Sequence, residues 1–426
     1  MFHELMLDEI AKMVGSRALN SRRELVRGVS INSLRTKPGD VFFALRGQHT
    51  DGHRYVTDAL QRGAVAVVVE KSQSIPGEIL VSDTLFALGE LARNYRGRFR
   101  VKTIGITGTN GKTTVRNLVA AILGRHSNVL YTNKNYNSLI GLPLTVLRLS
   151  GVEDYLVVEM GTSAPGEIKR LCDIAQPDVG MVTNVGPGHL EGLNSVDGVR
   201  KEKLSLIESL PAEGIAVVGE GVNISGRNNI IEFSTHMLEA LQITEHGSYF
   251  TYKNNAFFTS LLGIGNAYNC LAAICLTSAL GIDYETQRVA IEEAQPEPGR
   301  MKPIHMNGLL VIDDTYNANP VSMQAAIDFV AQLRRKKILV LGDMLELGEE
   351  TEHLHRDIGV YAQNHADLLV TFGHASRHYD GEHFSEEHKL LLYLKEKIAG
   401  DEVVLFKASR GLHFEKFVNG IARLLR

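Results

Sequence analysis

The stretch "TIGITGTNGKTTVRNLVAAIL", which begins at Thr103, constrains this chain more than any other part of it. An apolar, β-rich run leads into a glycine-rich turn, and a helix-like run follows. Glycines in such a turn let backbone N–H groups converge on phosphate oxygens, and the helix N-terminus adds partial positive charge. A lysine in the turn can reach the β- and γ-phosphates, and the hydroxyl after it can ligate Mg²⁺. The stretch therefore predicts a site for a nucleoside triphosphate.

The turn is a shortened variant of the phosphate loop. The strict pattern expects glycine at position 106, where Ile106 stands, and the glycine is found at Gly108 instead. A plain strand-to-helix turn with an exposed lysine is the alternative, but the flanking strand, the helix and the doubled threonines favour phosphate binding. The predicted phosphate-binding residues are Gly108, Thr109, Asn110, Gly111, Lys112, Thr113 and Thr114.

Composition limits the class of protein. The chain has 426 residues, too many for one ordinary core, and 44% of them are hydrophobic. A net charge of −4 argues against a general nucleic-acid or membrane-surface binder. The cysteines, which form neither a metal-ligand nor a disulfide pattern, are expected to be buried thiols in a reducing compartment: Cys172, Cys270 and Cys275. We see no signal peptide and no apolar run of about 20 residues, so we expect a cytoplasmic protein without a membrane span.

Strand-like and helix-like runs alternate along the chain, which indicates parallel βαβ units. The arginine-rich "ARNYRGRFR" closes a first block, and a third block begins near "PEPGR" and repeats the alternation. We therefore predict an α/β protein of three domains. They are a small N-terminal α/β substrate domain (1–99), a central P-loop ATPase domain with a parallel sheet (100–298) and a C-terminal Rossmann-like domain (299–426).

Polar residues follow the strand-like runs of the second block. In open parallel sheets, ligands bind beyond the carboxyl ends of the strands. Glu159 ends "DYLVVE", Asn184 ends "GMVTN", and His189 lies in the next loop. Beside a phosphate loop, Glu159 is a candidate Mg²⁺ ligand, although a solvated strand end is the alternative. His189 read alone is a hydrogen-bonded loop histidine, and Lys203 in "VRKEKLSLIESL" reads as part of a charged helix face.

The third block shows the same habit at its strand ends. One interpretation of "DDTYNANP" is an asparagine-rich turn that caps a helix starting near Ser322. A polar rim of this kind also suits a cleft that faces the nucleotide domain. The polar residues at these strand ends are Asp313, Asp314, Asp343, Lys407, Ser409 and Arg410.

The motifs together resemble the Mur ligases, ATP-dependent amide-bond ligases of bacterial cell-wall synthesis. "TGTNGKTT", "VVEMG", "TNVGPGHLEG", Lys203, "GRMKP" and "DDTYNANP" occur in the family's order, and the resemblance covers nearly the whole chain. Within the family, "YNANP", "LGDMLELG" and "NYNSLIGLPLTVL" are similar to the member that joins D-alanyl-D-alanine to UDP-N-acetylmuramoyl-tripeptide. The Asp-Asn-Pro-Arg motif expected of the tripeptide-forming relative is absent.

The resemblance implies a role for each matching residue. The catalytic group would be Lys112, Glu159, His189 and Lys203. Thr113 and Glu159 would ligate one Mg²⁺, and His189 and a carbamylated Lys203 a second. ATP would be held by the phosphate loop together with Asn269, Arg300 and Asp314. The nucleotide-sugar peptide would contact Asn135 and Asn137, and the dipeptide side of the cleft would carry Asn317, Asn319, Ser409 and Arg410. We expect a monomer.

The chain departs from the family pattern in three places. Asn32 and Leu34 stand where an acid and an arginine are expected, which weakens the prediction of uridine contacts. Gly265 stands where histidine is usual. The stretch 210–262 looks shorter than in the family, so we expect fewer strands at the edge of the central sheet.

The resemblance implies a ligation that passes through an acyl phosphate, with the third domain closing on the second when ATP binds. Three alternatives remain. They are another Mur-type ligase (tripeptide-forming or folylpolyglutamate-like), a small-molecule kinase that uses the same loop, and a nucleotide-controlled binding module without chemistry. The third residue of the tripeptide cannot be predicted from any of the motifs.

Overall fold

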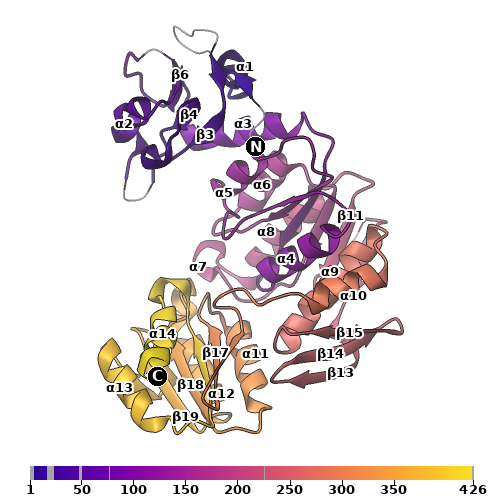
Figure 1. The fold of residues 1–426 in the computed structure, drawn as a ribbon, viewed down its shortest axis with the longest axis vertical. Coiled ribbons are helices and arrows are strands. Elements are labelled where there is room, and N and C mark those ends of the chain that lie inside the picture. The colour runs from indigo at the N-terminus through magenta and orange to yellow at the C-terminus, as the bar shows by residue number, and fades with distance from the viewer. Residues whose placement is uncertain (1–3, 17–23, 48–49, 76, 225, 425–426) are drawn as a thin grey trace.

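The computed structural model of the chain describes residues 4–16, 24–47, 50–75, 77–224 and 226–424. Three α/β units follow one another along its long axis, with the chain's first unit at one end and its last at the other (Figure 1). The predicted fold class, an α/β protein with three parts and parallel sheets, is therefore confirmed. Among the described residues, no helix is long and apolar enough to cross a membrane.

The N-terminal unit is built on a four-stranded parallel sheet in the order β3-β4-β5-β6, beside a two-stranded antiparallel pair. The two central strands, "DVFF" and "AVVV", are buried along their whole length, as continuous apolar runs in a parallel sheet should be. Its elements are β1 (Leu5–Met6), α1 (Leu7–Met13), β2 (Leu25–Val26), β3 (Gly28–Ser30), η1 (Ser33–Arg35), β4 (Asp40–Phe43), η2 (Gly52–Tyr55), α2 (Val56–Gln61), β5 (Ala66–Val69), β6 (Glu78–Leu80) and α3 (Thr84–Arg96).

The central unit is a six-stranded parallel sheet in the order β12-β11-β10-β7-β9-β8. A separate antiparallel sheet, β13-β14-β15, follows it. The elements are β7 (Lys102–Thr107), α4 (Lys112–Leu123), β8 (Val129–Tyr131), α5 (Gly141–Val146), β9 (Tyr155–Glu159), α6 (Glu167–Ala175), β10 (Val179–Val182), α7 (Leu190–Leu193), α8 (Val196–Glu208), β11 (Ile215–Gly219), β12 (Ile230–Phe233), η3 (Thr235–Met237), β13 (Glu239–Thr244), β14 (Gly247–Tyr252), β15 (Asn255–Thr259), α9 (Ile264–Ala279) and α10 (Tyr284–Glu292).

Alternation along the central strands sends side chains to two cores. Ile104 and Ile106 of β7 pack with α4 and α9, whereas Leu156 and Val158 of β9 pack with α6 on the opposite face. The cysteines are free and buried as predicted, and burial raises the pKa of Cys172 and Cys270 to about 12. The stretch 210–262 supplies β11, β12 and the separate sheet. That relatives have more strands here stays a prediction.

The N-terminal and central units share one hydrophobic core. Helix α3 lies against α5 and α6, and apolar residues of both units form a single buried cluster. The Tyr95 hydroxyl donates to the Leu149 carbonyl at 2.6 Å across this contact. Arg170 stacks on Phe86, with its guanidinium carbon 4.2 Å from the ring centroid, and pairs with Glu90 at 2.8 Å. The first unit is therefore firmly seated on the second.

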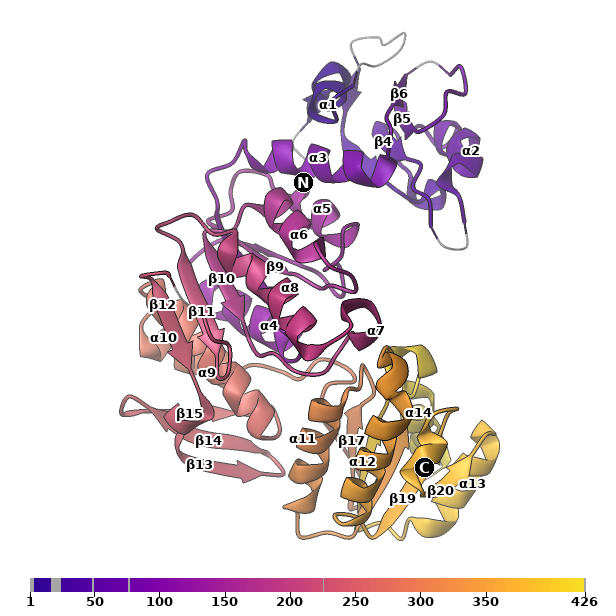
Figure 2. The same ribbon diagram turned by 180° about the vertical axis from the view of Figure 1, so that it is seen from behind.

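The C-terminal unit has a six-stranded sheet in the order β16-β17-β21-β18-β19-β20, in which only the edge pairing β16–β17 is antiparallel within the described chain. Helices α11 and α12 cover one face, and α13 and α14 the other (Figure 2). Its elements are β16 (Lys302–Met306), β17 (Leu309–Asp314), α11 (Pro320–Ala331), β18 (Lys337–Gly342), η4 (Gly348–Glu350), α12 (Thr351–Gln363), β19 (Leu368–Phe372), η5 (Ser376–Tyr379), β20 (Glu382–Phe384), α13 (Glu387–Lys397), β21 (Val403–Lys407), η6 (Arg410–Leu412) and α14 (Glu415–Leu424).

Helix α11 begins at Pro320, two residues before Ser322, near which the sequence predicts its start. The Asn319 side chain accepts from the Ser322 backbone N–H at 2.9 Å and so caps the helix, and proline suits the first helical position because its missing N–H would have no helical partner.

Candidate active site

A cavity of about 630 Å³ lies beyond the carboxyl ends of the central strands, and residues of the C-terminal unit line its other side. Most of the predicted site residues are brought together here. The predicted residues that line it are Thr109, Asn110, Gly111, Lys112, Thr113, Thr114, Asn135, Asn137, Glu159, His189, Asn269, Arg300, Asp314, Asn317 and Asn319. The predicted residues outside the lining are Gly108, Lys203, Ser409 and Arg410.

The phosphate loop needs its glycines for close contacts. A Cβ atom on Gly111 would lie 2.2 Å from the Asn269 side-chain oxygen, and one on Gly108 would lie 1.9 Å from the Thr183 hydroxyl. Gly111 also has φ +83°, a left-handed conformation that glycine adopts without strain. Lys112 Nζ donates to the carbonyls of Gly108 at 2.8 Å and Thr109 at 3.1 Å. Burial lowers the pKa of Lys112, and the nearby Glu159 carboxylate opposes that shift.

Glu159, at the end of β9, is the carboxylate beside this loop. It is 2% exposed. Its Oε2 accepts from the Thr113 hydroxyl at 2.9 Å and from Arg116 Nη1 at 3.3 Å, and its Oε1 accepts from Asn137 Nδ2 at 2.7 Å. A hydroxyl and a carboxylate next to a phosphate loop fit Mg²⁺, which commonly combines one or two carboxylates with phosphate oxygens and water. Within the described ranges, no three His, Cys, Asp or Glu residues gather as a metal-binding group, so these residues would need phosphate oxygens to complete the site.

His189 lies between the central and C-terminal units. It precedes α7 in a left-handed conformation, φ +56°, and its Nδ1 pairs with Glu346 of the loop after β18. The His189 ring beside it lowers the pKa of Glu346. The backbone N–H of Glu191 also donates to the Glu346 carbonyl, at 3.1 Å. The loop after β18 is thus attached to the loop after β10.

Lys203 lies on α8 and is 1% exposed, which excludes the solvated helix face that the sequence alone suggested. Burial lowers its pKa well below the ordinary range, and the positive charge of Lys112 adds to the shift. The adjacent Glu202 is already occupied, because it accepts from the backbone N–H groups of Gly166 and Ile168 at 2.7 Å each.

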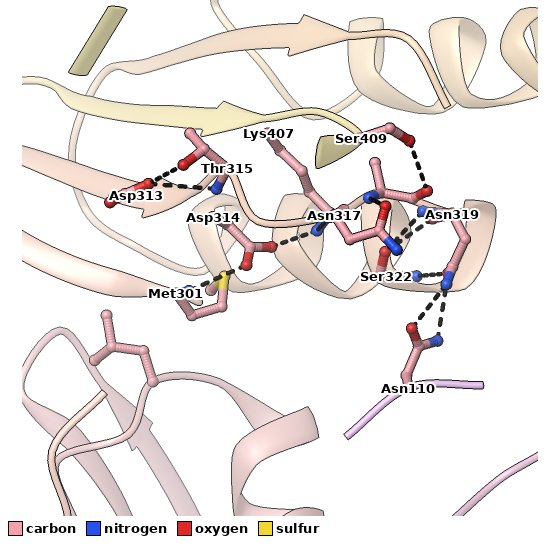
Figure 3. A network of polar contacts seen from close by, with 12 residues as sticks. Asn110, Met301, Asp313, Asp314, Thr315, Asn317, Asn319, Ser322, Lys407 and Ser409 are labelled. Carbon is pink, nitrogen blue, oxygen red and sulfur yellow. Dashed lines mark hydrogen bonds and ion pairs between the residues drawn. The ribbon is translucent and has the colours of Figure 1, made fainter. Parts of the chain in front are cut away.

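The polar loop after β17 forms the C-terminal side of the site (Figure 3). Lys407 Nζ contacts Asp314 Oδ2 at 2.5 Å and the Asn317 carbonyl at 3.0 Å, while Asp314 Oδ1 accepts from the Met301 N–H at 3.1 Å. The Ser409 hydroxyl donates to the Ala318 carbonyl at 3.3 Å. These contacts hold the loop in one shape, with the Asn317 and Asn319 side chains at the cavity.

Two side-chain contacts join this loop and its neighbours to the phosphate loop. Asn319 and Asn110 bond to each other through their amides (Figure 3). Arg300 Nη2 donates to the Thr113 hydroxyl at 2.9 Å, and its guanidinium carbon lies 4.0 Å from the centroid of the Tyr316 ring. Arg410 is 5.9 Å from the same ring and pairs with Glu415 at 3.2 Å.

The departures from the family pattern have local structural roles. Asn32 accepts from the Leu34 N–H at 3.0 Å and so caps η1, while the Leu34 side chain is 70% exposed. Gly265 lines the cavity, and a Cβ atom added there would meet nothing within 4 Å. The cavity therefore has room at the position where the family pattern has a histidine.

Three residues of the site escaped the sequence analysis: Arg116, Glu346 and Tyr316. Arg116 is 2% exposed although it lies on a helix, where an arginine ordinarily faces solvent. A signal existed for Glu346, because it lies in the loop after an apolar strand, where ligands of open sheets bind. Tyr316 stands inside "DDTYNANP", where the asparagines around it are the more obvious ligand-binding side chains.

Models of known families match all three units. The Mur ligase family catalytic domain matches residues 25–96, the Mur ligase middle domain residues 106–277, and the Mur ligase glutamate ligase domain residues 299–412.

Whole-chain relatives agree with these matches. The chain is 35% identical to UDP-N-acetylmuramoyl-tripeptide–D-alanyl-D-alanine ligase of Bacillus subtilis over 97% of each chain. It is 33% identical to the Escherichia coli protein of the same name over 92% of this chain and 93% of the relative. A crystal structure of MurF from Acinetobacter baumannii superposes with a TM-score of 0.92 at 26% identity, covering 99% of both chains. MurF ligase from Thermotoga maritima in complex with ADP gives 0.87 at 30% identity, covering 94% of this chain and 98% of that one.

Proposed function

The chain belongs to the Mur ligase family, and we propose on that premise that it joins D-alanyl-D-alanine to UDP-N-acetylmuramoyl-tripeptide. The reaction uses ATP and yields the UDP-N-acetylmuramoyl-pentapeptide, ADP and phosphate, as a step of peptidoglycan synthesis. The observation that carries this proposal is one cavity that the phosphate loop and Glu159 line on one side and residues of the "YNANP" loop line on the other. It gives one site both a place for ATP and a second polar rim for an amine substrate.

The proposed chemistry follows from what this cavity can hold. The peptide carboxylate attacks the γ-phosphate of ATP, and the acyl phosphate forms as ADP leaves. The uncharged amine of D-alanyl-D-alanine then attacks the acyl carbon and forms a tetrahedral intermediate. That intermediate expels phosphate, and the nitrogen gives up a proton to solvent as the amide forms. Lys112 Nζ donates to the carbonyls of Gly108 and Thr109 in this structure. When ATP binds, it donates to phosphate oxygens instead and stabilises the charge on the transferring group.

Two metal ions complete the proposed site. Thr113 and Glu159 would hold the first, and His189 and carbamylated Lys203 would hold the second. Bound Mg²⁺ neutralises developing negative charge on the phosphoryl and acyl oxygens. The support for carbamylation is the burial of Lys203 and its lowered pKa, because only a neutral amine reacts with CO₂. His189 is paired with Glu346 in this structure, so the histidine would have to leave Glu346 in order to bind a metal ion.

The remaining predicted residues take positions around this centre. Arg300 contacts the phosphates, since its guanidinium already reaches the Thr113 hydroxyl. Asn269 and Asp314 meet the adenosine, Asn135 and Asn137 meet the nucleotide-sugar peptide, and the dipeptide side carries Asn317, Asn319, Ser409 and Arg410. The same proposal includes closure of the C-terminal unit, a monomeric state and a cytoplasmic location. It also includes the domain limits 1–99, 100–298 and 299–426.

The test supplies UDP-N-acetylmuramoyl-tripeptide, D-alanyl-D-alanine and ATP, and detects the pentapeptide by mass. Lys112→Ala should reduce the rate of ligation at least 100-fold, about the loss expected on removing one preorganised hydrogen-bond donor to the developing negative charge. Lys201→Ala, on an exposed residue of α8, is the control. Normal turnover by a folded Lys112→Ala protein would contradict the proposed mechanism.

The same assay separates the alternatives. A tripeptide-forming or folylpolyglutamate-like ligase would accept another amino acid in place of the dipeptide, and a small-molecule kinase would release ADP with no amine present. A binding module would bind nucleotide without turnover. Each of these outcomes would replace the proposed reaction.

A further inference from the structure

Arg116 is among the largest fully buried side chains of the protein, and it does not line the cavity. It lies on α4, one turn after Lys112. A buried arginine needs partners for its donors, since a charge removed from water without compensation is costly. Burial lowers the pKa of Arg116, and Glu159 opposes this shift.

The guanidinium contacts Glu159, the loop after β8 and the neighbouring Asn117 of α4. Nη1 donates to Glu159 Oε2 at 3.3 Å and to the Lys134 carbonyl at 2.9 Å. Nε and Nη2 both donate to Asn117 Oδ1, at 3.0 and 2.6 Å. The first contact holds the carboxylate beside the phosphate loop, and the second holds the loop that carries Asn135 and Asn137.

The third contact continues to the segment that joins the central and C-terminal units. Asn117 Nδ2 donates to Glu297 Oε1 at 2.8 Å. Glu297 belongs to residues 293–301, between α10 and β16, which we call the linker. Its backbone carbonyl accepts from the Arg300 N–H at 3.1 Å, and the Arg300 side chain reaches Thr113. A continuous path of side chains therefore runs from the linker through Asn117 and Arg116 to Glu159.

We propose that Arg116 is a positioning residue that makes Mg²⁺ binding at Glu159 depend on the placement of the linker. The proposal rests on the proposed function for the identity of the metal site. Arg116 touches neither cavity nor ligand, and it acts by fixing one carboxylate oxygen. When the linker holds Asn117, the guanidinium is held in the orientation that aims Glu159 at the phosphate loop.

An arginine is required because its rigid fork of donors meets three acceptors at once, which the single ammonium of lysine cannot do with the same geometry. Outer-shell partners of metal ligands typically change metal affinity or activity by about 10- to 100-fold when mutated. We expect Arg116→Lys, which keeps the charge, to weaken Mg²⁺ binding by a factor in that range.

The experiment measures ADP affinity by calorimetry with and without Mg²⁺, so that the readout does not depend on turnover. In Arg116→Lys, the gain in ADP affinity that Mg²⁺ provides should fall at least 10-fold, while affinity without Mg²⁺ stays within about twofold. Glu297→Ala, on an exposed residue, should reduce the same gain about threefold. Glu292→Ala, at the end of α10 and outside the linker, is the matched control and should change nothing.

A double-mutant cycle tests the connection. If Glu297 acts through Arg116, then Glu297→Ala should add no further loss in the Arg116→Lys background. An unchanged Mg²⁺ effect in folded Arg116→Lys would overturn the positioning role, and additive losses would overturn the path to the linker. Should Arg116→Lys fail to fold, Glu297→Ala alone decides. If that variant left the Mg²⁺ effect on ADP affinity unchanged, the proposal would be contradicted. Wild-type protein that binds Mg²⁺ and ADP but makes no pentapeptide would refute the proposed function and leave this inference standing.

Discussion

Asn110 and Asn319, separated by 209 positions in the sequence, bond to each other through their side-chain amides. Asn110 Nδ2 donates to Asn319 Oδ1 at 3.3 Å, and Asn319 Nδ2 donates to Asn110 Oδ1 at 2.7 Å. Asn319 also caps α11, so one side chain both starts a helix of the C-terminal unit and contacts the phosphate loop. The position of that helix is thereby tied to the loop that we expect to hold ATP.

The two roles of Asn319 can be separated by mutation. Asn319→Asp keeps an oxygen that caps α11 but removes the donor to Asn110, so its melting temperature should stay near wild type while kcat falls about 10-fold. Asn319→Ala loses the cap as well and should lower the free energy of unfolding by about 1 kcal/mol. Calorimetry and steady-state ligation kinetics measure the two effects. Equal kinetics for Asn319→Asp and wild type would show that the contact with Asn110 is not used.

Lys203 should carry CO₂ in the active protein. With ¹³C-labelled bicarbonate, we expect a carbamate signal in the carbon NMR spectrum of wild type and of Lys201→Ala, and none from Lys203→Met. Methionine fills most of the buried volume, so Lys203→Met should stay folded but lose about 100-fold in kcat. Full activity of Lys203→Met, or an undiminished carbamate signal in it, would contradict the proposed second metal site.

The buried histidine of α12 predicts a dependence of stability on pH. His355 Nε2 accepts from the Met344 N–H at 3.0 Å, its Nδ1 donates to the Thr351 carbonyl at 2.6 Å, and burial lowers its pKa. As pH falls, this histidine therefore gains its proton at a higher pH in the unfolded chain than in the folded protein. Stability should be complete above the ordinary histidine pKa of about 6.5 and decline below it, by at most about 1.4 kcal/mol per pH unit.

Urea unfolding from about pH 7.5 to about pH 5.5 measures this decline, because that range spans the ordinary histidine pKa. His355→Gln should be less stable at neutral pH but show a flatter dependence on pH, since glutamine can still accept from Met344 without gaining a proton. His353→Gln, on an exposed histidine of the same helix, is the control. A slope that stays unchanged in His355→Gln would assign the pH dependence to other groups.

The sequence predicted those features that local pattern determines. The β7–turn–α4 arrangement, with Gly111 just before the helix and Lys112 at its start, follows from residues that are neighbours in the chain. The positions of Glu159 and Asp314 at strand ends follow from apolar runs that stop at a charged residue. Because parallel strands place their carboxyl ends at one edge, those residues could be expected in one site.

Contacts between distant segments could not be predicted in the same way. Nothing in the period of α4 distinguishes a buried Arg116 from a solvated one, because two of its partners, Lys134 and Glu159, come from other segments of the chain. The pairing of His189 with Glu346 depends on how two units are placed relative to each other, which hydrophobic periodicity does not encode. The burial of Lys203 likewise results from packing around α8, and its helix has the charged appearance of a surface helix.

The core shared through α3 has a mechanical consequence. Separating the N-terminal from the central unit would expose apolar surface to water, at about 25 cal/mol for each Å². The side-chain contacts between the C-terminal unit and the phosphate loop are polar, between Asn110 and Asn319 and between Thr113 and Arg300. The central unit adds few apolar residues to the C-terminal core: buried Leu262 and the partly buried Leu190 and Ile243. Moving the third unit therefore exposes less apolar surface than separating the first two. The first two units should therefore move as one rigid body, so that a substrate bound across both keeps its distance from the ATP phosphates. The amine substrate, bound to the third unit, should move with that unit.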